Sequence, residues 1–340
     1  MPLTVLATLP LPAQHEAELR ELNAEVSTLQ FDGIIENELP SWNAAMITSA
    51  AFRLPDSGAA LYEQLADLVR RGRVEWVHFC AAGMDGQMFI PLIRAAHAAG
   101  IKMTYCPGVY ATPIAQYVIA HVLSCTRMLR EHAEQQASKT WAPLMQRDPR
   151  GAVVGVVGAG GIGNEVARMA TALGMRSIGW RRRAGSFGSF EDIFTGEEGL
   201  DALLMESDFV VVAVPNTPQT RNLINTEKLA LMKPSAWIIN VARGAVIDEI
   251  ALTTALQIES APPAGAVLDV AAVEPLAHDS PLWSMQNVVI TPHDSWMTQR
   301  AAKDNTAYFV DNLRRLQRGE ALREPVPAEY IDPVIELNPH

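Results

Sequence analysis

The sequence predicts an α/β protein built from two doubly wound parallel-sheet domains, and three observations support this. Short apolar runs alternate with amphipathic stretches almost throughout the 340-residue chain, which is typical of parallel strands joined by helices. The alternation forms two series, and the second begins at 151–158 with GAVVGVVG. A chain of this length exceeds what one core usually accommodates, so two domains are expected.

The first series of apolar runs occupies the N-terminal third of the chain and predicts one sheet. Its members are short and apolar, as buried strands usually are. They are LTVLATL (3–9), AAMITSA (44–50), VEWVHFC (74–80) and IKMTYC (101–106). Helical stretches with one apolar face separate them, at 16–26, 57–72 and 88–100.

The second series predicts a larger sheet, because six strand-like runs in succession are typical of a complete dinucleotide-binding domain. The runs are 153–158, 176–180, 208–215, 236–242, 265–270 and 287–292. Between the two series, residues 112–137 are expected to form one long connecting helix. A last helix is expected over 299–319, ending at Gly319 with basic residues in its final turns.

The composition is that of an ordinary globular chain with an acidic surplus. The net charge is −11 and the pI about 5.2, so binding of nucleic acid has no electrostatic support. Cys80, Cys106 and Cys125 form no CxxC pair and show no zinc-like spacing. They are expected to be reduced, packed thiols, and no metal site is predicted. Without a basic leader or a long apolar run, the chain is expected to be cytoplasmic and not membrane-bound.

A glycine-rich loop, GAGGIG, follows the first strand of the second series and opens an amphipathic helix. This context turns a common glycine spacing into a specific signal for dinucleotide binding. Gly158 permits a tight turn, Gly160 lets the backbone approach a diphosphate, and Gly163 lets helix and strand pack closely. The diphosphate is expected on the N–H groups near Gly161 and Ile162. A glycine-rich turn without a ligand is the alternative.

Three arginines end the second strand of this series, where an NAD-binding domain usually places an acidic residue for the ribose 2′-hydroxyl. The chain reads Trp180, Arg181, Arg182 and Arg183, with no carboxylate before Glu191. A guanidinium grips a 2′-phosphate, which a carboxylate would repel. The sequence therefore predicts NADP(H) as the preferred cofactor, with NAD(H) possible. A solvated basic loop is the alternative.

Chemically useful side chains follow three later strands of the second series. Arg243 lies in INVARGAVIDE, Asp269 and Glu274 in LDVAAVEPLAHDSPLW, and His293 in VVITPHDSW. Open α/β sheets bind their ligands at the carboxyl ends of strands. These four side chains are therefore expected to share one site.

In this order, the motifs resemble those of the D-isomer-specific 2-hydroxyacid dehydrogenase family, over about residues 74–319. The family carries an Arg in an RG turn, a Glu before Pro and a His in a PH pair. Arg243, Glu274 and His293 stand at these positions. The resemblance implies a reductase of a small 2-oxoacid, such as glyoxylate or hydroxypyruvate, that forms the D-2-hydroxyacid; the arginine run makes NADPH its expected cofactor.

The residue types suit this chemistry. A 2-oxoacid is a planar anion that Arg243 can bind through two hydrogen bonds while polarising the carbonyl. Hydride transfer builds negative charge on the carbonyl oxygen, and His293 can supply the proton because histidine titrates near neutrality. Glu274 would accept from the other ring nitrogen and fix the tautomer. Each residue alone also fits a structural role.

The resemblance further implies contacts to cofactor and substrate. Asp269 would bind the nicotinamide carboxamide, and Ala82 and Gly83, in the loop CAAGMDG, would present backbone amides to the substrate carboxylate; an ordinary turn is the alternative for this loop. The remaining residues expected to line the cofactor site are Val214, Pro215, Asn216, Thr220, Val241 and Ala242.

The resemblance also implies how the domains are built and assembled. A flavodoxin-like substrate domain would comprise residues 1–117 and 298–340, with a Rossmann cofactor domain inserted as residues 118–297. The family is usually dimeric through its cofactor domains. The segment around Trp141 is a candidate arm that crosses to the neighbouring subunit's site.

Two positions depart from the family pattern and leave the substrate open. After His293 the family commonly has small residues, but this chain has Trp296 nearby, which would either line the substrate pocket or pack between domains. Gln116 stands where many relatives have Glu. Two further functions stay open: a nucleotide-sensing corepressor, which needs no proton donor, and a formate or phosphite dehydrogenase. Formate enzymes carry Gln where Glu274 stands, and both kinds usually favour NAD.

Overall fold

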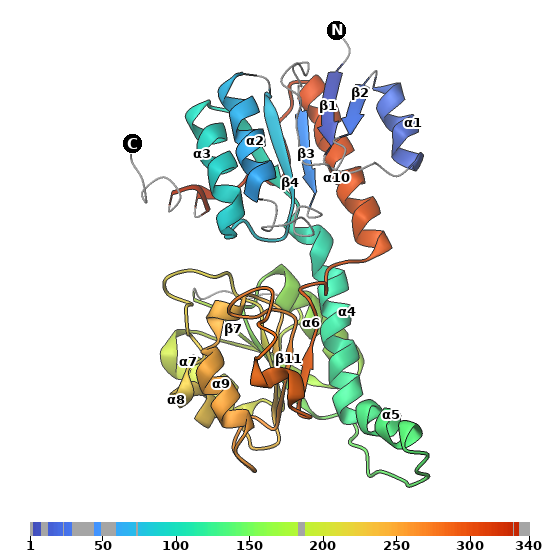
Figure 1. Cartoon of the computed structure of the whole chain (residues 1–340), viewed down its shortest axis with the longest axis vertical. Helices are drawn as coiled ribbons and strands as arrows, with labels where there is room; N and C mark the ends of the chain where they lie inside the picture. Colours follow the sequence, from blue (N-terminus) through green and yellow to red (C-terminus); the bar gives the residue numbers. More distant parts are fainter. Residues whose placement is uncertain are drawn as a thin grey trace. The chain divides into compact units, whose positions relative to one another are not determined.

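The computed structural model divides the chain into two units, Met1–Tyr110 with Thr298–His340, and Ala111–Met297. The structure describes residues 3–7, 13–22, 24–28, 44–48, 59–72, 74–182, 188–328 and 330–332. The first unit contains the N-terminal and C-terminal parts of the chain, and the second is inserted between them (Figure 1). Among the described helices, none is both long and apolar enough to span a bilayer.

The first unit is a parallel sheet of five strands in the order β2-β1-β3-β4-β5, the doubly wound arrangement of flavodoxin-like domains. The strands are β1 (Leu3–Ala7), β2 (Ala24–Thr28), β3 (Ala44–Thr48), β4 (Trp76–Cys80) and β5 (Lys102–Tyr105). The helices of this unit are α1 (Ala13–Glu21), α2 (Ala59–Arg70), α3 (Ile90–Ala98) and α10 (Gln299–Gln317).

Strand β4 is buried along its whole length because helices cover both faces of the sheet. Val77 and Phe79 join the apolar cluster formed with α2 and α3. Trp76 points to the other face, where its ring stacks on Phe309 of α10 with centroids 4.9 Å apart. Successive side chains of a strand alternate between faces, so His78 and Cys80 share the α10 face with Trp76.

The second unit is a parallel sheet of seven strands in the order β12-β11-β10-β9-β6-β7-β8. The direction of strand order reverses between β6 and β9, the switch point at which Rossmann domains bind their cofactor. The strands are β6 (Val153–Val157), β7 (Arg176–Trp180), β8 (Asp192–Phe194), β9 (Phe209–Val212), β10 (Trp237–Asn240), β11 (Gly265–Leu268) and β12 (Val288–Ile290). The predicted fold class is confirmed for both units.

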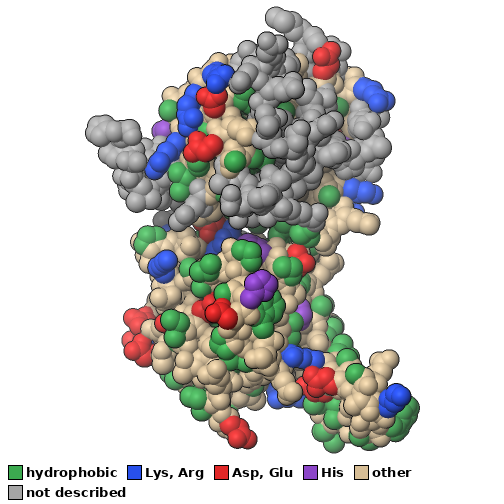
Figure 2. Space-filling view, in the orientation of Figure 1, with side chains coloured by type: hydrophobic (Ala, Val, Ile, Leu, Met, Phe, Trp, Pro, Cys, Tyr) green, Lys and Arg blue, Asp and Glu red, His purple; other side chains and the backbone are tan. Residues whose placement is uncertain are grey.

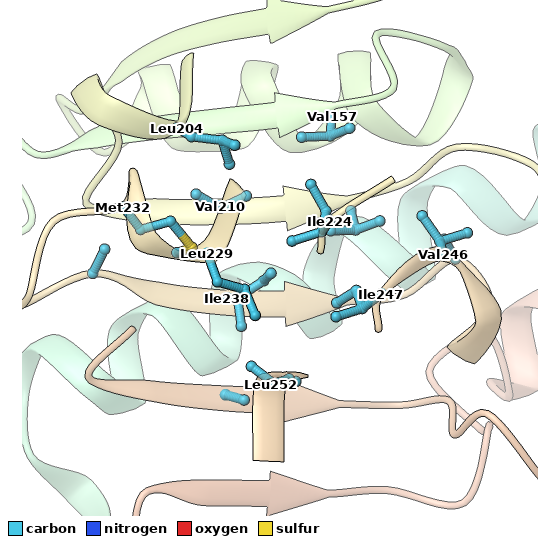
Figure 3. Packing of buried hydrophobic residues seen from close by; sticks show 14 of the residues in the cluster. Val157, Leu204, Val210, Ile224, Leu229, Met232, Ile238, Val246, Ile247 and Leu252 are labelled. Atoms are coloured by element: carbon cyan, nitrogen blue, oxygen red, sulfur yellow. The ribbon is translucent and has the colours of Figure 1, made fainter. Parts of the chain in front are cut away.

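All six strands predicted for this sheet are present, and β8 is an additional one. It has only three residues and begins with Asp192, so it produces no apolar run. On one face, helices α7 (Gly196–Glu206), α8 (Thr226–Ala230) and α9 (Glu249–Leu256) accompany the sheet. Figure 3 shows part of the buried cluster formed there, in which Val210 and Ile238 of neighbouring strands lie beside Leu229 and Met232.

The predicted single helix over 112–137 is wrong, because the structure has two helices. These are α4 (Pro107–Thr126) and α5 (Leu129–Ala137). Met128 between them has φ 51°, which no α-helix accommodates. The Thr126 hydroxyl donates to the carbonyls of Val122 and Leu123, 3.0 and 3.1 Å away, and closes the last turn of α4. Thr, Arg and Met all occur within helices, so the side-chain pattern gives no sign of this break.

The last helix lies where the sequence predicts it. The Thr298 side chain caps the start of α10 by accepting a hydrogen bond from the Ala301 N–H at 3.0 Å. Gly319 follows the helix with φ 66°, the left-handed conformation usual after a helix C-terminus. The boundary between the units falls at Tyr110, within α4, earlier than the predicted boundary at 117.

Candidate active site

The glycine-rich loop joins β6 to helix α6 (Gly161–Ala172). Gly158 has φ 117°, and a β-carbon there would lie 2.5 Å from the carbonyl oxygen of Ala213. The N–H groups of Gly158 and Ala159 both donate to the Trp180 carbonyl, at 2.9 and 3.0 Å. Only glycine satisfies both the conformation and the close approach at position 158.

The start of α6 has the form expected of a diphosphate site. A β-carbon at Gly163 would overlap the carbonyl of Gly158, so the helix packs tightly against the strand. At Gly160 and Gly161, by contrast, a β-carbon would project into open space. The first N–H groups of a helix have no acceptor within it, so those near Ile162 are positioned for an anion. The loop therefore fits a dinucleotide.

The predicted ribose-phosphate residues lie at the end of β7. Val157 pairs with Trp180, so the end of β7 lies beside the glycine loop. Arg181 is half-buried and its backbone N–H donates to the Phe194 carbonyl at 3.1 Å, while Arg182 is exposed. Arg183 lies outside the described residues.

The first two carboxylates after these arginines, Glu191 and Asp192, are engaged at the opposite end of β7. Arg176, at the start of the strand, forms ion pairs with Glu191 at 2.9 Å, Asp192 at 2.8 Å and Glu206 at 2.6 Å. Glu191 therefore does not take the acidic position found in NAD-binding domains.

Arg243 lies in the turn after β10, and its half-buried side chain donates to the Ala242 carbonyl at 2.8 Å. The next residue, Gly244, packs directly on the backbone of Ala271, because a β-carbon there would overlap it. Asn240 holds the turn by donating to the Arg243 carbonyl at 3.1 Å. The Arg243 turn is thus packed against the segment that carries Glu274.

His293 and Glu274 form the predicted pair. His293 Nδ1 lies 2.8 Å from Glu274 Oε2. The imidazole is 24% exposed and the carboxylate side chain 40% exposed, so both remain accessible to a small molecule. A carboxylate beside Nδ1 favours a proton on that nitrogen and leaves proton transfer to Nε2; a catalytic role for His293 stays a prediction.

The surroundings keep Glu274 ionised. Burial raises the pKa of this carboxyl group, but the hydrogen bond and charge of His293 lower it. The Ala271 N–H, 3.2 Å from Oε1, and the charge of Arg243 act in the same direction. Together these effects exceed that of burial, and the pKa of Glu274 lies below its usual value.

Asp269 organises the segment that carries His293. It is 1% exposed and accepts hydrogen bonds from the hydroxyls of Thr291, at 2.6 Å, and Ser295. The Asp294 N–H also donates to it, at 3.0 Å. These bonds hold His293 at φ 55°, a left-handed conformation that the surrounding structure must impose. A contact from Asp269 to a nicotinamide stays a prediction.

Trp296 lies beside the same segment. Its indole Nε1 donates to the His293 carbonyl at 3.0 Å, and the side chain is half-buried. This bond fixes one edge of the indole to the backbone of His293. Lining of a substrate pocket by Trp296 stays a prediction.

The other predicted cofactor residues lie at the ends of two neighbouring strands. Val214, Pro215, Asn216 and Thr220 follow β9, and Val241 and Ala242 follow β10. The Thr220 hydroxyl donates to the Pro215 carbonyl at 2.6 Å and closes that loop. Strand β9 adjoins both β6 and β10, so all six residues lie on the carboxyl side of the sheet with the glycine loop.

Ala82 and Gly83 belong to the first unit, in the loop that follows β4. The Tyr110 hydroxyl donates to the Cys80 carbonyl at 2.6 Å and fixes the start of this loop. Their contact with a substrate stays a prediction.

Sequence reasoning misses three positioning residues of the second unit: Asn240, Thr291 and Ser295. Each is a polar side chain at or just after a strand end, in a segment already singled out for another residue. Their place at a strand end is the one signal in the sequence that could have identified them, since the sequence does not show which groups they bond to. Asn240 bonds to the Arg243 turn, and Thr291 and Ser295 bond to Asp269.

Residues 119–295 match the family model described as "D-isomer specific 2-hydroxyacid dehydrogenase, NAD binding domain". This match covers more than half of the chain and contains the glycine loop, Arg243, Glu274 and His293. The chain belongs to the D-isomer-specific 2-hydroxyacid dehydrogenase family. It is therefore an NAD(P)-dependent oxidoreductase of small 2-hydroxyacids and 2-oxoacids.

Individual members of the family resemble the chain over most of its length. A glyoxylate/hydroxypyruvate reductase B of Pectobacterium carotovorum is 36% identical over 233 residues, 67% of this chain and 72% of that protein. A family structure from Aeromonas salmonicida is 26% identical with a TM-score of 0.78, covering 96% of this chain and 99% of that one. Another, from Xanthobacter autotrophicus in complex with NADPH and MES, is 28% identical with a TM-score of 0.73, covering 96% and 98%.

Proposed function

We propose that this dehydrogenase reduces a small 2-oxoacid, with glyoxylate and hydroxypyruvate as the leading candidates, to the D-2-hydroxyacid using NADPH. The proposal is carried by the 2.8 Å pairing of His293 with Glu274, in the same unit as Arg243 and the glycine loop. The similarity to the glyoxylate/hydroxypyruvate reductase of Pectobacterium supports the substrate class.

Three side chains divide the chemistry. The Arg243 guanidinium binds the substrate carboxylate and polarises the neighbouring carbonyl. When bound, a reduced nicotinamide supplies the hydride. His293 donates its Nε2 proton to the carbonyl oxygen as negative charge develops there. Glu274 holds the Nδ1 proton and stabilises the positive ring before the transfer. The family resemblance makes Ala82 and Gly83 candidates for backbone contacts with the substrate carboxylate.

The preference for NADPH rests on the two ends of β7. In the sequence, Arg181, Arg182 and Arg183 follow the second strand of this sheet, the position from which Rossmann domains contact the ribose 2′-substituent. The first two carboxylates after these arginines, Glu191 and Asp192, are paired with Arg176 at the opposite end of β7, at 2.9 and 2.8 Å. The NADPH complex of the Xanthobacter relative is compatible with this preference.

A panel of 2-oxoacids assayed with NADPH and NADH side by side tests the proposal. Glyoxylate or hydroxypyruvate should be reduced, with a lower KM for NADPH than for NADH. Replacing Arg181 and Arg182 together by Ala should raise the KM for NADPH by about 10- to 100-fold, because charge-assisted hydrogen bonds are lost. The KM for NADH should change little.

The matched control is Arg150→Ala, which removes an exposed guanidinium paired with Asp148 at 2.6 Å. It should leave both KM values unchanged. A wild-type preference for NADH would refute the cofactor assignment, and no turnover with any 2-oxoacid would refute the reductase.

We also propose a homodimer in which the segment after α5 reaches the neighbouring subunit. Trp141 and Met145 are fully or nearly fully exposed, at 102% and 93%, and hydrophobic side chains gather at this end of the second unit (Figure 2). Large exposed apolar side chains commonly mark interfaces. Trp141→Ala should weaken the dimer in sedimentation experiments and alter the KM for the oxoacid; no change in either would remove the support for this arm.

A further inference from the structure

A buried cluster of three metal-ligating side chains lies in the first unit, apart from the residues assigned to catalysis. His78, Cys80 and Cys106 each offer one nitrogen or sulfur atom, and these atoms all lie within 4.8 Å of one another. The residues are 0%, 2% and 0% exposed. In the described part of the chain, no other group of His, Cys, Asp and Glu side chains meets in this way.

Sheet geometry explains why the sequence conceals this cluster. Residues 78 and 104 pair across β4 and β5, and so do 79 and 105. If this register continues by one residue, Cys106 lies beside Cys80. Residues paired on parallel strands point to the same face of the sheet, so these two cysteines do as well. His78 precedes Cys80 by two residues and therefore shares that face. Strand pairing thus creates a ligand set that linear spacing does not show.

The imidazole of His78 has one nitrogen held and one available. Nδ1 lies 2.8 Å from the Thr104 hydroxyl oxygen, which also accepts a hydrogen bond from Trp76 Nε1 at 2.9 Å. Nε2 is completely buried and has no hydrogen-bond partner among the described residues. Leaving a buried polar atom unsatisfied is costly. Metal-binding histidines typically donate one N–H to such a fixed oxygen and coordinate through the other nitrogen.

We propose that His78, Cys80 and Cys106 bind a zinc ion. Zn²⁺ is coordinated in proteins by imidazole nitrogen and thiolate sulfur, usually with four ligands. The Asn305 side-chain oxygen accepts a hydrogen bond from Cys106 Sγ at 3.0 Å, and this oxygen or a water molecule would complete the four ligands. A tetrahedral zinc ion holds two thiolate sulfurs about 3.8 Å apart, a spacing compatible with the mutual distances in the cluster.

The donor set selects this class of ion over the commoner divalent cations. Mg²⁺ and Ca²⁺ require several oxygen ligands, and the cluster contains no carboxylate. Two thiolates balance the two positive charges of Zn²⁺. The loaded site therefore carries no net charge, which reduces the cost of burying it. Each cysteine releases its proton to the solvent when the ion binds.

The site joins two neighbouring strands at the point where the loop of Ala82 and Gly83 begins. We expect a structural role, because His78, Cys80 and Cys106 are at most 2% exposed and a substrate has no access to them. An ion that binds the folded state but not the unfolded state raises the unfolding temperature. Zinc should therefore stabilise the first unit and its loop without taking part in hydride transfer.

Metal analysis of the full-length reduced protein tests the proposal. After chelator treatment, loading with Zn²⁺ and gel filtration, the wild type should retain about one zinc per chain. Loading with Co²⁺ should produce a thiolate-to-cobalt charge-transfer band. Absence of both retained zinc and this band, with all thiols shown to be reduced, would overturn the proposal.

Cysteine variants locate the ion. Cys80→Ser and Cys106→Ser should each lose the retained zinc and the cobalt band, whereas Cys125→Ser, which changes the cysteine of α4 in the second unit, should keep both. Equal zinc content in all three variants would mean surface binding and would also overturn the proposal. Because Cys106→Ser alters a buried side chain, the wild-type cobalt spectrum provides a test that does not depend on its folding.

Discussion

His293 and His78 are both imidazoles positioned by parallel strands, but different groups face their nitrogens. Nδ1 of His293 lies 2.8 Å from the Glu274 carboxylate, and the side chain is 24% exposed. Nδ1 of His78 lies 2.8 Å from the Thr104 hydroxyl, and the residue is fully buried. A carboxylate and an open side suit proton transfer, whereas thiols and a sealed environment suit metal binding. The two imidazoles therefore suit different tasks because their surroundings differ, although the residue type is the same.

Replacement of His293 by Ala should have the largest effect on catalysis. Loss of a positioned proton donor is expected to lower kcat by about 10²- to 10⁴-fold. NADPH should still bind, which fluorescence titration measures, because the glycine loop is untouched. His278→Ala is the matched control, since it removes an exposed imidazole of the same unit, and it should retain normal turnover. Normal turnover of His293→Ala would refute the proton-donor assignment.

Glu274→Gln sharpens the comparison by leaving the hydrogen bond possible while removing the charge. Loss of the Glu274 charge should lower kcat by about 10- to 100-fold, because the protonated His293 ring is no longer stabilised before proton transfer. Steady-state rates at neutral pH measure this effect. An unchanged kcat would show that the charge of Glu274 does not contribute.

The pH profile distinguishes the wild type from this variant further. The pKa of Glu274 lies below its usual value, so its carboxylate persists as the pH falls through the ordinary carboxyl range and is lost only below it. Wild-type kcat/KM should therefore not fall through titration of Glu274 within that range. Initial rates measured across this pH range test the expectation, with Glu274→Gln as control because it lacks the titrating group. A wild-type decline centred at the ordinary carboxyl pKa, absent from the variant, would contradict the lowered pKa.

His78→Phe should have the smallest effect on turnover and a clear effect on metal-dependent stability. Phenylalanine removes the unsatisfied Nε2 atom but also the buried hydrogen bond between Nδ1 and Thr104, so the metal-free variant should unfold close to the temperature of the metal-free wild type. Zinc should raise the unfolding temperature of the wild type only, as scanning fluorimetry measures. A kcat within about twofold of wild type is expected. An equal zinc-induced shift in both proteins would exclude His78 as a ligand.

The sequence predicts those elements in which a local constraint dictates the residue type. Gly158 is recognisable because only glycine tolerates its φ of 117° beside the Ala213 carbonyl, and six strands are recognisable from continuous apolar runs. Strand β8 escapes prediction because it is short and starts with Asp192. The break at Met128 escapes it because the left-handed conformation leaves no mark on the residue type.

In the candidate site, too, some residues can be predicted from the sequence and others cannot. Arg243, Glu274 and His293 are recognisable from their places in motifs. The hydrogen bonds of Asp269 to Thr291 and Ser295 are not, because they depend on how two segments are placed in space. Proximity of Cys80 and Cys106 depends in turn on strand register, which no spacing rule captures.

The contact of Gly244 with the backbone of Ala271 has a consequence for engineering. Because no side chain fits at position 244, the Arg243 turn and the Glu274 segment cannot adjust independently of each other. Selection for bulkier oxoacids should leave this junction unchanged. Accepted mutations should instead accumulate at half-buried side chains beside this junction, such as Trp296.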